Sequence, residues 1–329
     1  MKILVTGGAG YIGSHAVYQL IEQNYQVVVV DNLVTGSSTN LHPEAKYYRV
    51  DLRDYQTLKN VFETEQDIRV IMHFAASALV GESVNKPLEY FDNNLNGLKN
   101  LLDLANQFDI KHFVFSSTAA VYGNPKTIPI SEADCQEPIN PYGWSKLAGE
   151  ALLKAWAKTQ DAAYVILRYF NVAGAHENGL IGLKSNNLSN LLPVVIDHLI
   201  NDKTFNIYGN DYQTKDGTCI RDYVHVMDLI EGHILALKWM LATSKSEIFN
   251  LGSGIGHSVL EVCQTIETTL GVKLKTNINN RRSGDPEILL SNIEKAQKLL
   301  NWEPKRTLEQ MIETEYHFRK NFVAKEENN

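Results

Sequence analysis

Three side chains in the middle of the sequence have the types and the spacing needed to move a proton. Tyr142 and Lys146 stand four residues apart, and residues at positions i and i+4 of a helix lie on the same face. An ammonium group beside a phenol lowers the pKa of the phenol, so the pair predicts a tyrosine that acts as a general base toward an alcohol. Thr118 ends an apolar run and supplies a hydroxyl that can donate to a substrate oxygen and share the proton with Tyr142. The Tyr-x-x-x-Lys spacing is common by itself, and only the three groups together point to catalysis.

A glycine-rich turn near the N-terminus predicts a dinucleotide site. Gly7, Gly10 and Gly13 follow a short β-branched run and precede a helical pattern, and Gly8 completes a G-x-G-x-x-G spacing. Glycine lets the chain turn tightly and lets backbone N–H groups approach a pyrophosphate, which the start of the next helix also attracts. The motif is weak in isolation, but a strand, a turn and a helix occur here in the required order.

An acidic residue at the end of the second expected strand indicates which dinucleotide is bound. Asp31 follows Gly13 by 31 − 13 = 18 residues. A carboxylate at this place can hydrogen-bond both ribose hydroxyls of an adenosine and would repel a 2′-phosphate, so we expect NAD rather than NADP. A solvated turn aspartate is the alternative. The ends of the next two strands are expected to add cofactor contacts from Asp51, Leu52, Phe74, Ala75 and Ala76.

The elements that must position these groups alternate between strands and helices in the first half of the chain. Short β-branched or aromatic runs predict strands, and longer stretches with helical spacing predict helices. The expected strands are residues 3–6, 26–31, 47–51, 70–74, 113–116 and 164–167, and the expected helices are 12–23, 55–65, 90–108 and 142–158. This alternation gives βαβ crossovers and a sheet covered by helices on both faces. The fold class is therefore α/β, a Rossmann-type doubly wound parallel sheet.

The pattern changes after Tyr169. Residues 174–220 are rich in Gly, Asn, Asp and Pro around one expected helix. The expected elements of this half are helices at 191–201, 226–242, 257–270, 292–300 and 307–323 and a strand at 247–251. We interpret it as a smaller mixed α/β C-terminal substrate lobe. The expected NAD-binding domain is 1–170, with roughly 218–245 returning to it, and the substrate lobe is roughly 171–217 and 246–329.

Composition and charge limit the class of protein. The 329 residues are 44% hydrophobic and 21% charged, with a net charge of −7, which argues against nucleic acid or an anionic membrane as a partner. Cys135, Cys219 and Cys263 are too far apart for a disulfide framework, and the histidines show no zinc spacing. We therefore expect no metal. Without a signal peptide or an apolar run that could cross a bilayer, a cytoplasmic protein is expected.

Taken together, these motifs resemble the extended short-chain dehydrogenase/reductase family, and within it the UDP-glucose 4-epimerases (UDP-galactose 4-epimerases). The resemblance covers nearly the whole chain. The matching segments are 6–15, 31–33, 80–83, 92–94, 116–118, 121–123, 141–146, 167–171, 208–209, 216–218, 221–226 and 281–285. The N-terminal motifs are shared by the whole family, whereas the C-terminal motifs are more specific to the epimerases.

The resemblance implies a closed redox cycle on the hexose of a UDP-sugar. Tyr142 would take the proton of the 4-hydroxyl while carbon C4 passes a hydride to tightly held NAD. The 4-keto sugar would then rotate and receive the hydride on its other face. Because the sugar must turn, binding energy is expected to concentrate on the uridine and the pyrophosphate, remote from the reacting carbon. The resemblance also implies a homodimer that pairs through the helices near 90–108 and 142–158.

Residue roles follow from the same resemblance. Lys146 would also bond the nicotinamide ribose, and the remaining expected cofactor contacts are Tyr11, Ile12, Asn32, Asn93, Ser116 and Tyr169. The expected substrate contacts are Thr118, Tyr142, Asn171, Asn190, Leu191, Tyr208, Arg221, Tyr223, Arg282, Asp285 and Leu289. The arginines can form charge-assisted bonds to phosphate, although in the absence of the resemblance surface charges would be the favoured interpretation.

Several alternatives stay open at this point. In the related 4,6-dehydratases an Asp-Glu pair follows the catalytic threonine, and here those positions are Ala119 and Ala120, so elimination lacks its proton carriers. A related decarboxylase keeps a glutamate at the second position, which is also missing. A NAD-binding regulatory protein on this fold usually loses the tyrosine or the lysine, and both are present. Epimerases of UDP-N-acetyl sugars or of UDP-glucuronate are further alternatives.

Substrate breadth depends on Leu289. In the family a large aromatic residue at this position blocks N-acetylated sugars and a small residue admits them, and leucine is intermediate in size. We expect UDP-glucose and UDP-galactose as the main substrates and leave N-acetylated sugars open. Two departures from the family pattern are Thr118, where many relatives have serine, and Ala78, where the best-known bacterial epimerases have a lysine near the cofactor.

Overall fold

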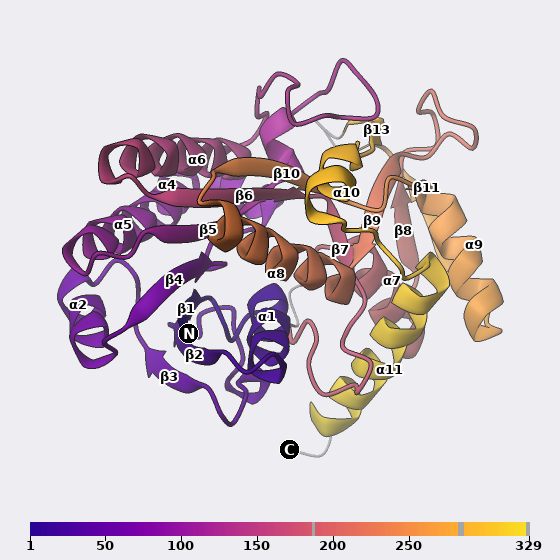
Figure 1. The fold of residues 1–329 in the computed structure, drawn as a ribbon. Coiled ribbons are helices and arrows are strands. Elements are labelled where there is room, and N and C mark those ends of the chain that lie inside the picture. The colour runs from indigo at the N-terminus through magenta and orange to yellow at the C-terminus, as the bar shows by residue number, and fades with distance from the viewer. Residues whose placement is uncertain (186–187, 282–285, 327–329) are drawn as a thin grey trace.

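The computed structural model describes residues 1–185, 188–281 and 286–326, and its largest unit is a parallel sheet of seven strands (Figure 1). The strands, in the order in which they lie in the sheet, are β10 (Glu247–Leu251), β6 (Ala163–Tyr169), β5 (His112–Thr118), β4 (Ile68–His73), β1 (Lys2–Thr6), β2 (Gln26–Asp31) and β3 (Lys46–Arg49). The order reverses direction between β1 and β4, and open α/β sheets bind ligands at such a switch point. The expected doubly wound Rossmann-type sheet is confirmed.

Helices cover both faces of this sheet. The helices on one face are α1 (Tyr11–Glu22) and α8 (Val226–Thr243), and those on the other are α2 (Tyr55–Thr64), α5 (Gly97–Gln107) and α6 (Pro141–Gln160). Alternate strand residues point to opposite faces, so Ile3 and Val5 join the core under α1 and α8, whereas Leu4 joins the core under the other three helices. Because both faces are buried, the central strands β1 and β2 are mainly apolar, whereas the edge strand β3 keeps Lys46 and Arg49 exposed.

A smaller lobe, at the right of Figure 1, holds two short sheets. Its strands are β7 (Asn171–Ala173), β9 (Ile220–His225), β11 (Gly256–Ser258) and β13 (Ile288–Leu289) in one sheet, and β8 (Phe205–Tyr208) with β12 (Thr276–Asn279) in the other. Helices α7 (Leu191–Ile200), α9 (Val259–Leu270) and α11 (Leu308–Glu326) pack together over this lobe's core. These strands have two to six residues and mix apolar with polar residues, so they are too short for hydrophobic alternation to reveal them.

Two expected domain boundaries are wrong. The sequence places residues 247–251 in the substrate lobe, whereas β10 pairs with β6 and forms an edge of the large sheet. The sequence returns residues from 218 onward to the large domain, whereas β9 pairs with β7, β11 and β13 in the small lobe. Only α8, which follows β9, packs on the large sheet, and α10 (Glu294–Leu300) later packs against α8 and β10. A five-residue strand carries no local signal for the sheet that it joins.

The helix expected over residues 90–108 is interrupted. The chain forms α3 (Val80–Asn85), α4 (Pro87–Phe91), a π-helical turn at Asp92–Asn96 and then α5. Turns of this kind are rare and often occur at functional sites. Two 3₁₀ turns complete the fold, η1 (Ser38–Asn40) and η3 (Ala119–Tyr122), and the second directly follows β5.

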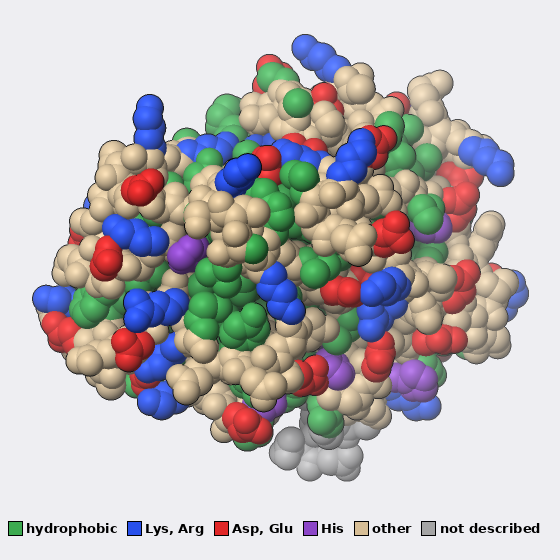
Figure 2. All heavy atoms as spheres, in the orientation of Figure 1, with side chains coloured by type: hydrophobic (Ala, Val, Ile, Leu, Met, Phe, Trp, Pro, Cys, Tyr) green, Lys and Arg blue, Asp and Glu red, His purple; other side chains and the backbone are tan. Residues whose placement is uncertain are grey.

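The surface mixes charges of both signs. Lys and Arg side chains alternate with Asp and Glu side chains over the face drawn in Figure 2. Among the helices of the described ranges, none is long and apolar enough to cross a membrane.

Candidate active site

Tyr142, Lys146 and Thr118 meet where β5 ends and α6 begins. Asn140 caps α6 by accepting a hydrogen bond from the backbone N–H of Gly143 at 2.8 Å, and a proline occupies the first helical position. The cap fixes the first turns of α6, from which Tyr142 and Lys146 project. Thr118 is the last residue of β5, and its hydroxyl accepts from the backbone N–H of Ala120 at 3.1 Å and lowers the pKa of the Tyr142 phenol against burial. All three side chains are buried.

Burial dominates the acid–base state of this group. It raises the pKa of Tyr142 to about 12, against the hydrogen bond with Thr118. It lowers the pKa of Lys146 to about 8, against the negative charge of Glu150. The ammonium group of Lys146 donates to the carbonyl oxygen of Ser116 at 2.8 Å. In this arrangement desolvation of the phenolate, rather than the charge of Lys146, dominates the pKa of Tyr142.

The glycine turn joins β1 to α1 as expected. Gly7 has a φ of +73°, and its N–H donates to the carbonyl of Val30 at 2.8 Å. A Cβ added at Gly13 would lie 2.2 Å from the carbonyl oxygen of Gly7, and one added at Gly7 would lie 2.6 Å from the backbone nitrogen of Ala75. Only glycine fits at these two positions. The turn thus leaves bare backbone at the start of α1, which suits a pyrophosphate.

The turn also contacts the smaller lobe and the end of β4. Gly10 caps α1, which opens with Tyr11 and Ile12, and the phenol of Tyr11 donates to the carbonyl oxygen of Gly174. The Phe74-Ala75-Ala76 run leaves β4 directly beneath the turn, since Ala75 is the residue that Gly7 approaches. The sequence therefore identified a set of residues that the fold does bring together.

Asp31 lies beside the glycine turn at the end of β2. Its Oδ2 accepts from the backbone N–H of Ala9 at 3.0 Å, and its Oδ1 accepts from that of Leu33 at 2.8 Å. Burial raises the pKa of this carboxyl, and the two backbone donors oppose the rise. A carboxylate can accept about four hydrogen bonds, so capacity for ribose hydroxyls remains.

Asp51 follows β3 and contacts Asn32, the residue after Asp31. The amide of Asn32 donates to Asp51 at 3.1 Å, and Arg53 donates to both Asp51 oxygens, which holds the pKa of Asp51 well below its usual range. Leu52 packs against the start of α5 at Gly97. Asp51 and Leu52 therefore lie beside Asn32 and the start of α5, and the carboxylate of Asp51 is already paired with Arg53.

Replacing Asp31 by alanine should weaken NAD binding and relax the discrimination against NADP. The change removes the acceptor for the ribose hydroxyls together with the charge that repels a 2′-phosphate. Titration of purified protein stripped of nucleotide, followed by fluorescence with each dinucleotide, measures both affinities. An unchanged ratio of the two affinities would mean that Asp31 only stabilises its turn.

His233, which sequence reasoning missed, packs against residues at the ends of β4, β5 and β6. The ring of His233 on α8 lies 5.1 Å from that of Phe74 and 5.9 Å from that of Tyr169, and its Nε2 is 3.3 Å from Ser116 Oγ. Burial lowers the pKa of His233 to about 4, so the imidazole is neutral. It ties α8 to the ends of β4, β5 and β6. A lone histidine within a helix gave no signal of this role.

The π-helical turn places two asparagines behind the catalytic helix. Asn93 donates to Ser77 Oγ at 3.1 Å. Asn94, which sequence reasoning also missed, accepts from the Ser77 N–H at 2.8 Å and donates to Ser145 Oγ at 2.9 Å. The segment after β4 is thereby linked to α6 between Tyr142 and Lys146. Polar amides inside a helical pattern were the only available hint.

Four expected substrate residues share the small sheet. Asn171 pairs with Tyr223, and Arg221 pairs with Leu289. Leu289 also packs on the apolar cluster of Ala119, Val121, Tyr122, Ile130 and Phe170, which begins immediately after Thr118. The sheet therefore brings the expected specificity position next to the catalytic strand.

The other expected substrate residues are less closely placed. Tyr208 ends β8, and the exposed Asn190 precedes Leu191 at the start of α7, which packs on β8. Arg282 and Asp285 lie outside the described residues. The preceding Arg281 binds Asp211 at 2.6 Å and lies 3.9 Å from the centre of the Tyr212 ring.

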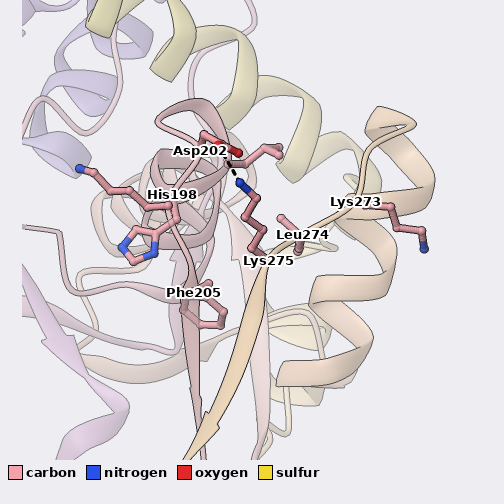
Figure 3. Close-up of a pocket in the computed structure, with 8 residues that line it drawn as sticks. His198, Asp202, Phe205, Lys273, Leu274 and Lys275 are labelled. Atoms are coloured by element: carbon pink, nitrogen blue, oxygen red, sulfur yellow. Dashed lines mark hydrogen bonds and ion pairs between the residues drawn. The ribbon is translucent and has the colours of Figure 1, made fainter.

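A small cavity in the second lobe is separate from these residues. It has a volume of about 20 Å³ and lies between the end of α7 and the start of β12. Figure 3 shows Asp202 and Lys275 paired beside it, with His198 and Phe205 below. A space of this size holds about one water molecule, so it is not a substrate site. In the part of the chain that the structure describes, no three His, Cys, Asp or Glu side chains gather closely enough to hold a metal.

The geometry fits a bound dinucleotide, because the glycine turn, Asp31 and the Phe74 run line one edge of the sheet. A family model described as the NAD dependent epimerase/dehydratase family matches residues 3–252. The chain belongs to this family. The match spans the whole large sheet together with β7, β8 and β9.

Individual members of the family are similar over almost the full length. The UDP-glucose 4-epimerase of Lacticaseibacillus casei is 48% identical over 327 residues, which is 98% of this chain and 97% of that protein. A UDP-glucose 4-epimerase from Stenotrophomonas maltophila, solved with bound NAD and formylated UDP-arabinopyranose, is 37% identical with a TM-score of 0.95, covering 99% of both chains. The UDP-Glc/GlcNAc 4-epimerase of Campylobacter jejuni is 40% identical with a TM-score of 0.85, covering 97% of this chain and 99% of that one.

Proposed function

We propose that this protein is an NAD-dependent UDP-glucose 4-epimerase that interconverts UDP-glucose and UDP-galactose. The observation that carries the proposal is the buried placement of Tyr142 and Lys146 on α6 beside Thr118 at the end of β5, with Lys146 anchored to the carbonyl oxygen of Ser116 on that strand. Beside it, the glycine turn and Asp31 fit NAD. The curated relatives that carry this activity are similar over nearly the whole chain.

The chain's own residues supply the proton chemistry. Tyr142 takes the proton of the sugar 4-hydroxyl as a general base, and Thr118 holds that hydroxyl and shares the proton. When bound, NAD takes up the hydride of C4, returns it to either face of the ketone, and brings a positively charged ring. Because burial raises the pKa of Tyr142 to about 12, the phenolate depends on positive charge nearby, and Lys146 is the cationic side chain of this group.

We propose that the two lobes bind different ligands. We assign NAD to the large-sheet lobe and the UDP-sugar to the small lobe, where Asn171, Arg221, Tyr223 and Leu289 are placed by β7, β9 and β13. The 4-keto sugar must rotate, so the nucleotide has to carry most of the binding energy. Arg221 is the described cation that suits a phosphate of the diphosphate.

Turnover of UDP-galactose by the purified protein tests the function. UDP-glucose is detected by coupling to a UDP-glucose dehydrogenase, and the sugar product is identified by mass spectrometry and NMR. An epimerase gives UDP-glucose with no net consumption of its bound NAD. Release of a permanently oxidised 4-keto sugar would instead indicate a dehydratase, and bound NAD without any turnover would indicate a regulatory protein.

Replacing Leu289 by tyrosine should abolish any activity on UDP-N-acetyl sugars and spare UDP-glucose and UDP-galactose. A larger ring at the edge of the cluster after Thr118 narrows the space around the sugar. Rates with UDP-N-acetylgalactosamine and UDP-galactose are compared for both proteins. Parallel loss of both activities would count against Leu289 as a specificity position.

We also propose that the enzyme is a cytoplasmic homodimer. Helix α6 presents Trp144, Ala148, Ala151 and Ala155 on one side at helical spacing, and Trp144, Ala151 and Ala155 are exposed. An exposed apolar stripe of this kind favours helix packing against a second copy. Light scattering of the purified protein measures the mass in solution, and a monomer at micromolar concentration would contradict the dimer.

A further inference from the structure

The catalytic helix carries a fully buried carboxylate one turn beyond Lys146. Glu150 Oε1 accepts hydrogen bonds from Ser117 Oγ at 2.6 Å and from Arg168 Nε at 2.9 Å, and Oε2 accepts from Arg168 Nη2 at 2.6 Å. Glu150 is 0% exposed and Arg168 is 1% exposed. The proton chemistry described above does not use this ion pair.

The partners of Glu150 belong to the two strands that end at the active site. Ser117 lies between Ser116, whose carbonyl accepts from Lys146, and Thr118, the last residue of β5. Arg168 lies on the neighbouring strand β6, where it pairs in register with Ser117 of β5. A displacement of α6 along β5 would break all three bonds to Glu150, and breaking a buried ion pair is strongly destabilising. The network therefore fixes the position of α6 along β5, and with it the position of Tyr142 relative to Thr118.

Charge gives Glu150 a second effect on the site. Lys146 and Glu150 are at i and i+4 of α6 and lie on one face, and the negative charge of Glu150 raises the pKa of Lys146 against burial. Burial keeps the surrounding titratable groups neutral, which are His73 on β4, Tyr90 on α4, Tyr122 on η3 and Tyr169 on β6. The charged groups nearest to Glu150 are Arg168 and Lys154, and both contact its carboxylate. Glu82 accepts a hydrogen bond from Tyr90.

We propose that Glu150 is a positioning residue for this reaction: its carboxylate holds α6 in register with β5 and keeps the ammonium group of Lys146 protonated at neutral pH. The inference rests on the proposed function. It adds to that function a residue that touches neither sugar nor cofactor and acts through Lys146 and Ser117.

The variant Glu150→Gln tests the charge, because glutamine keeps the shape and an acceptor oxygen. A lysine is charged below its pKa, so loss of the neighbouring negative charge makes Lys146 lose its proton at lower pH. The alkaline limb of the kcat–pH profile should therefore move down by about one pH unit. Side-chain NMR of lysine-labelled protein, with Lys146→Met to assign the resonance, follows the same titration without any turnover and should show the same shift.

Ser117→Ala is the matched control, because it removes one hydrogen bond to Glu150 and leaves the charge in place. It should lower the thermal midpoint and leave the alkaline limb and the Lys146 titration unmoved. If Glu150→Gln does not fold, the double variant Glu150→Gln with Arg168→Met replaces the pair by neutral groups of similar volume. Because Arg168→Met also removes a positive charge that disfavours the ammonium form of Lys146, a downward shift smaller than that of Glu150→Gln is expected.

The outcomes separate this inference from the proposed function. If the wild-type protein epimerises UDP-galactose but Lys146 in Glu150→Gln titrates as it does in the wild type, Glu150 is only structural and the inference is wrong. If the wild-type protein has no epimerase activity, the proposed function fails. The NMR titration still decides whether Glu150 controls the charge of Lys146.

Discussion

Tyr142→Phe should lose at least about 100-fold in kcat, the scale of a missing general base, while the protein keeps its bound NAD. The change removes one oxygen from a buried site beside Thr118, whose hydroxyl stays in place. The glycine turn and Asp31 are untouched, so cofactor binding has no reason to change. Initial rates with UDP-galactose and the nucleotide content of the denatured protein measure the two effects.

The same substitution elsewhere provides the control. Tyr164, at the start of β6, is half-buried and lies at the opposite end of that strand from the active site, so Tyr164→Phe should turn over as the wild type does. Near-normal turnover by Tyr142→Phe would overturn the assignment of the base. Loss of NAD from that variant would mean that Tyr142 holds the cofactor rather than the proton.

Gly13→Ala should eliminate tight NAD binding. The new methyl group would lie 2.2 Å from the carbonyl oxygen of Gly7, which no packed structure tolerates, so the turn must open and the N–H groups at the start of α1 move away from the pyrophosphate. Overpacking of this kind costs roughly 1–3 kcal/mol in stability. Absorbance of nucleotide released on denaturation and the midpoint of thermal unfolding report the two losses.

Gly81→Ala is the matched comparison for this change. A Cβ at Gly81 meets nothing within 4 Å, and alanine favours the helix α3 in which it lies. That variant should bind NAD normally and be as stable as the wild type or more so. Equal behaviour of the two alanine variants would show that the turn adapts and that Gly13 is not required for its shape.

The sequence predicted the large sheet well because its strands are apolar on both faces and alternate with amphipathic helices. Residues 26–31 and 247–251 match β2 and β10 in their bounds. The strands of the small lobe were missed because they are short and of mixed polarity, and the residues of β12 are all exposed. Their pairing depends on contacts between segments far apart in the chain, which periodicity does not encode.

The candidate site divides in the same way. Groups held by local motifs, such as the glycine turn and the Tyr142–Lys146 pair, could be named from spacing. His233, Asn94 and Glu150 could not, because each acts through a partner on a different element. The pKa of Tyr142 was misjudged for a related reason: spacing places a cation near the phenol but does not reveal that burial raises its pKa to about 12.

The late position of β10 has a consequence for how this protein is made. Strand β6 is complete at Tyr169, but its outer neighbour begins only at Glu247. During synthesis the hydrogen-bonding edge of β6 is therefore uncovered while more than seventy residues emerge, and unpaired edges favour association between chains. A truncated chain that ends before β10 should accumulate as aggregates rather than as a free NAD-binding fragment.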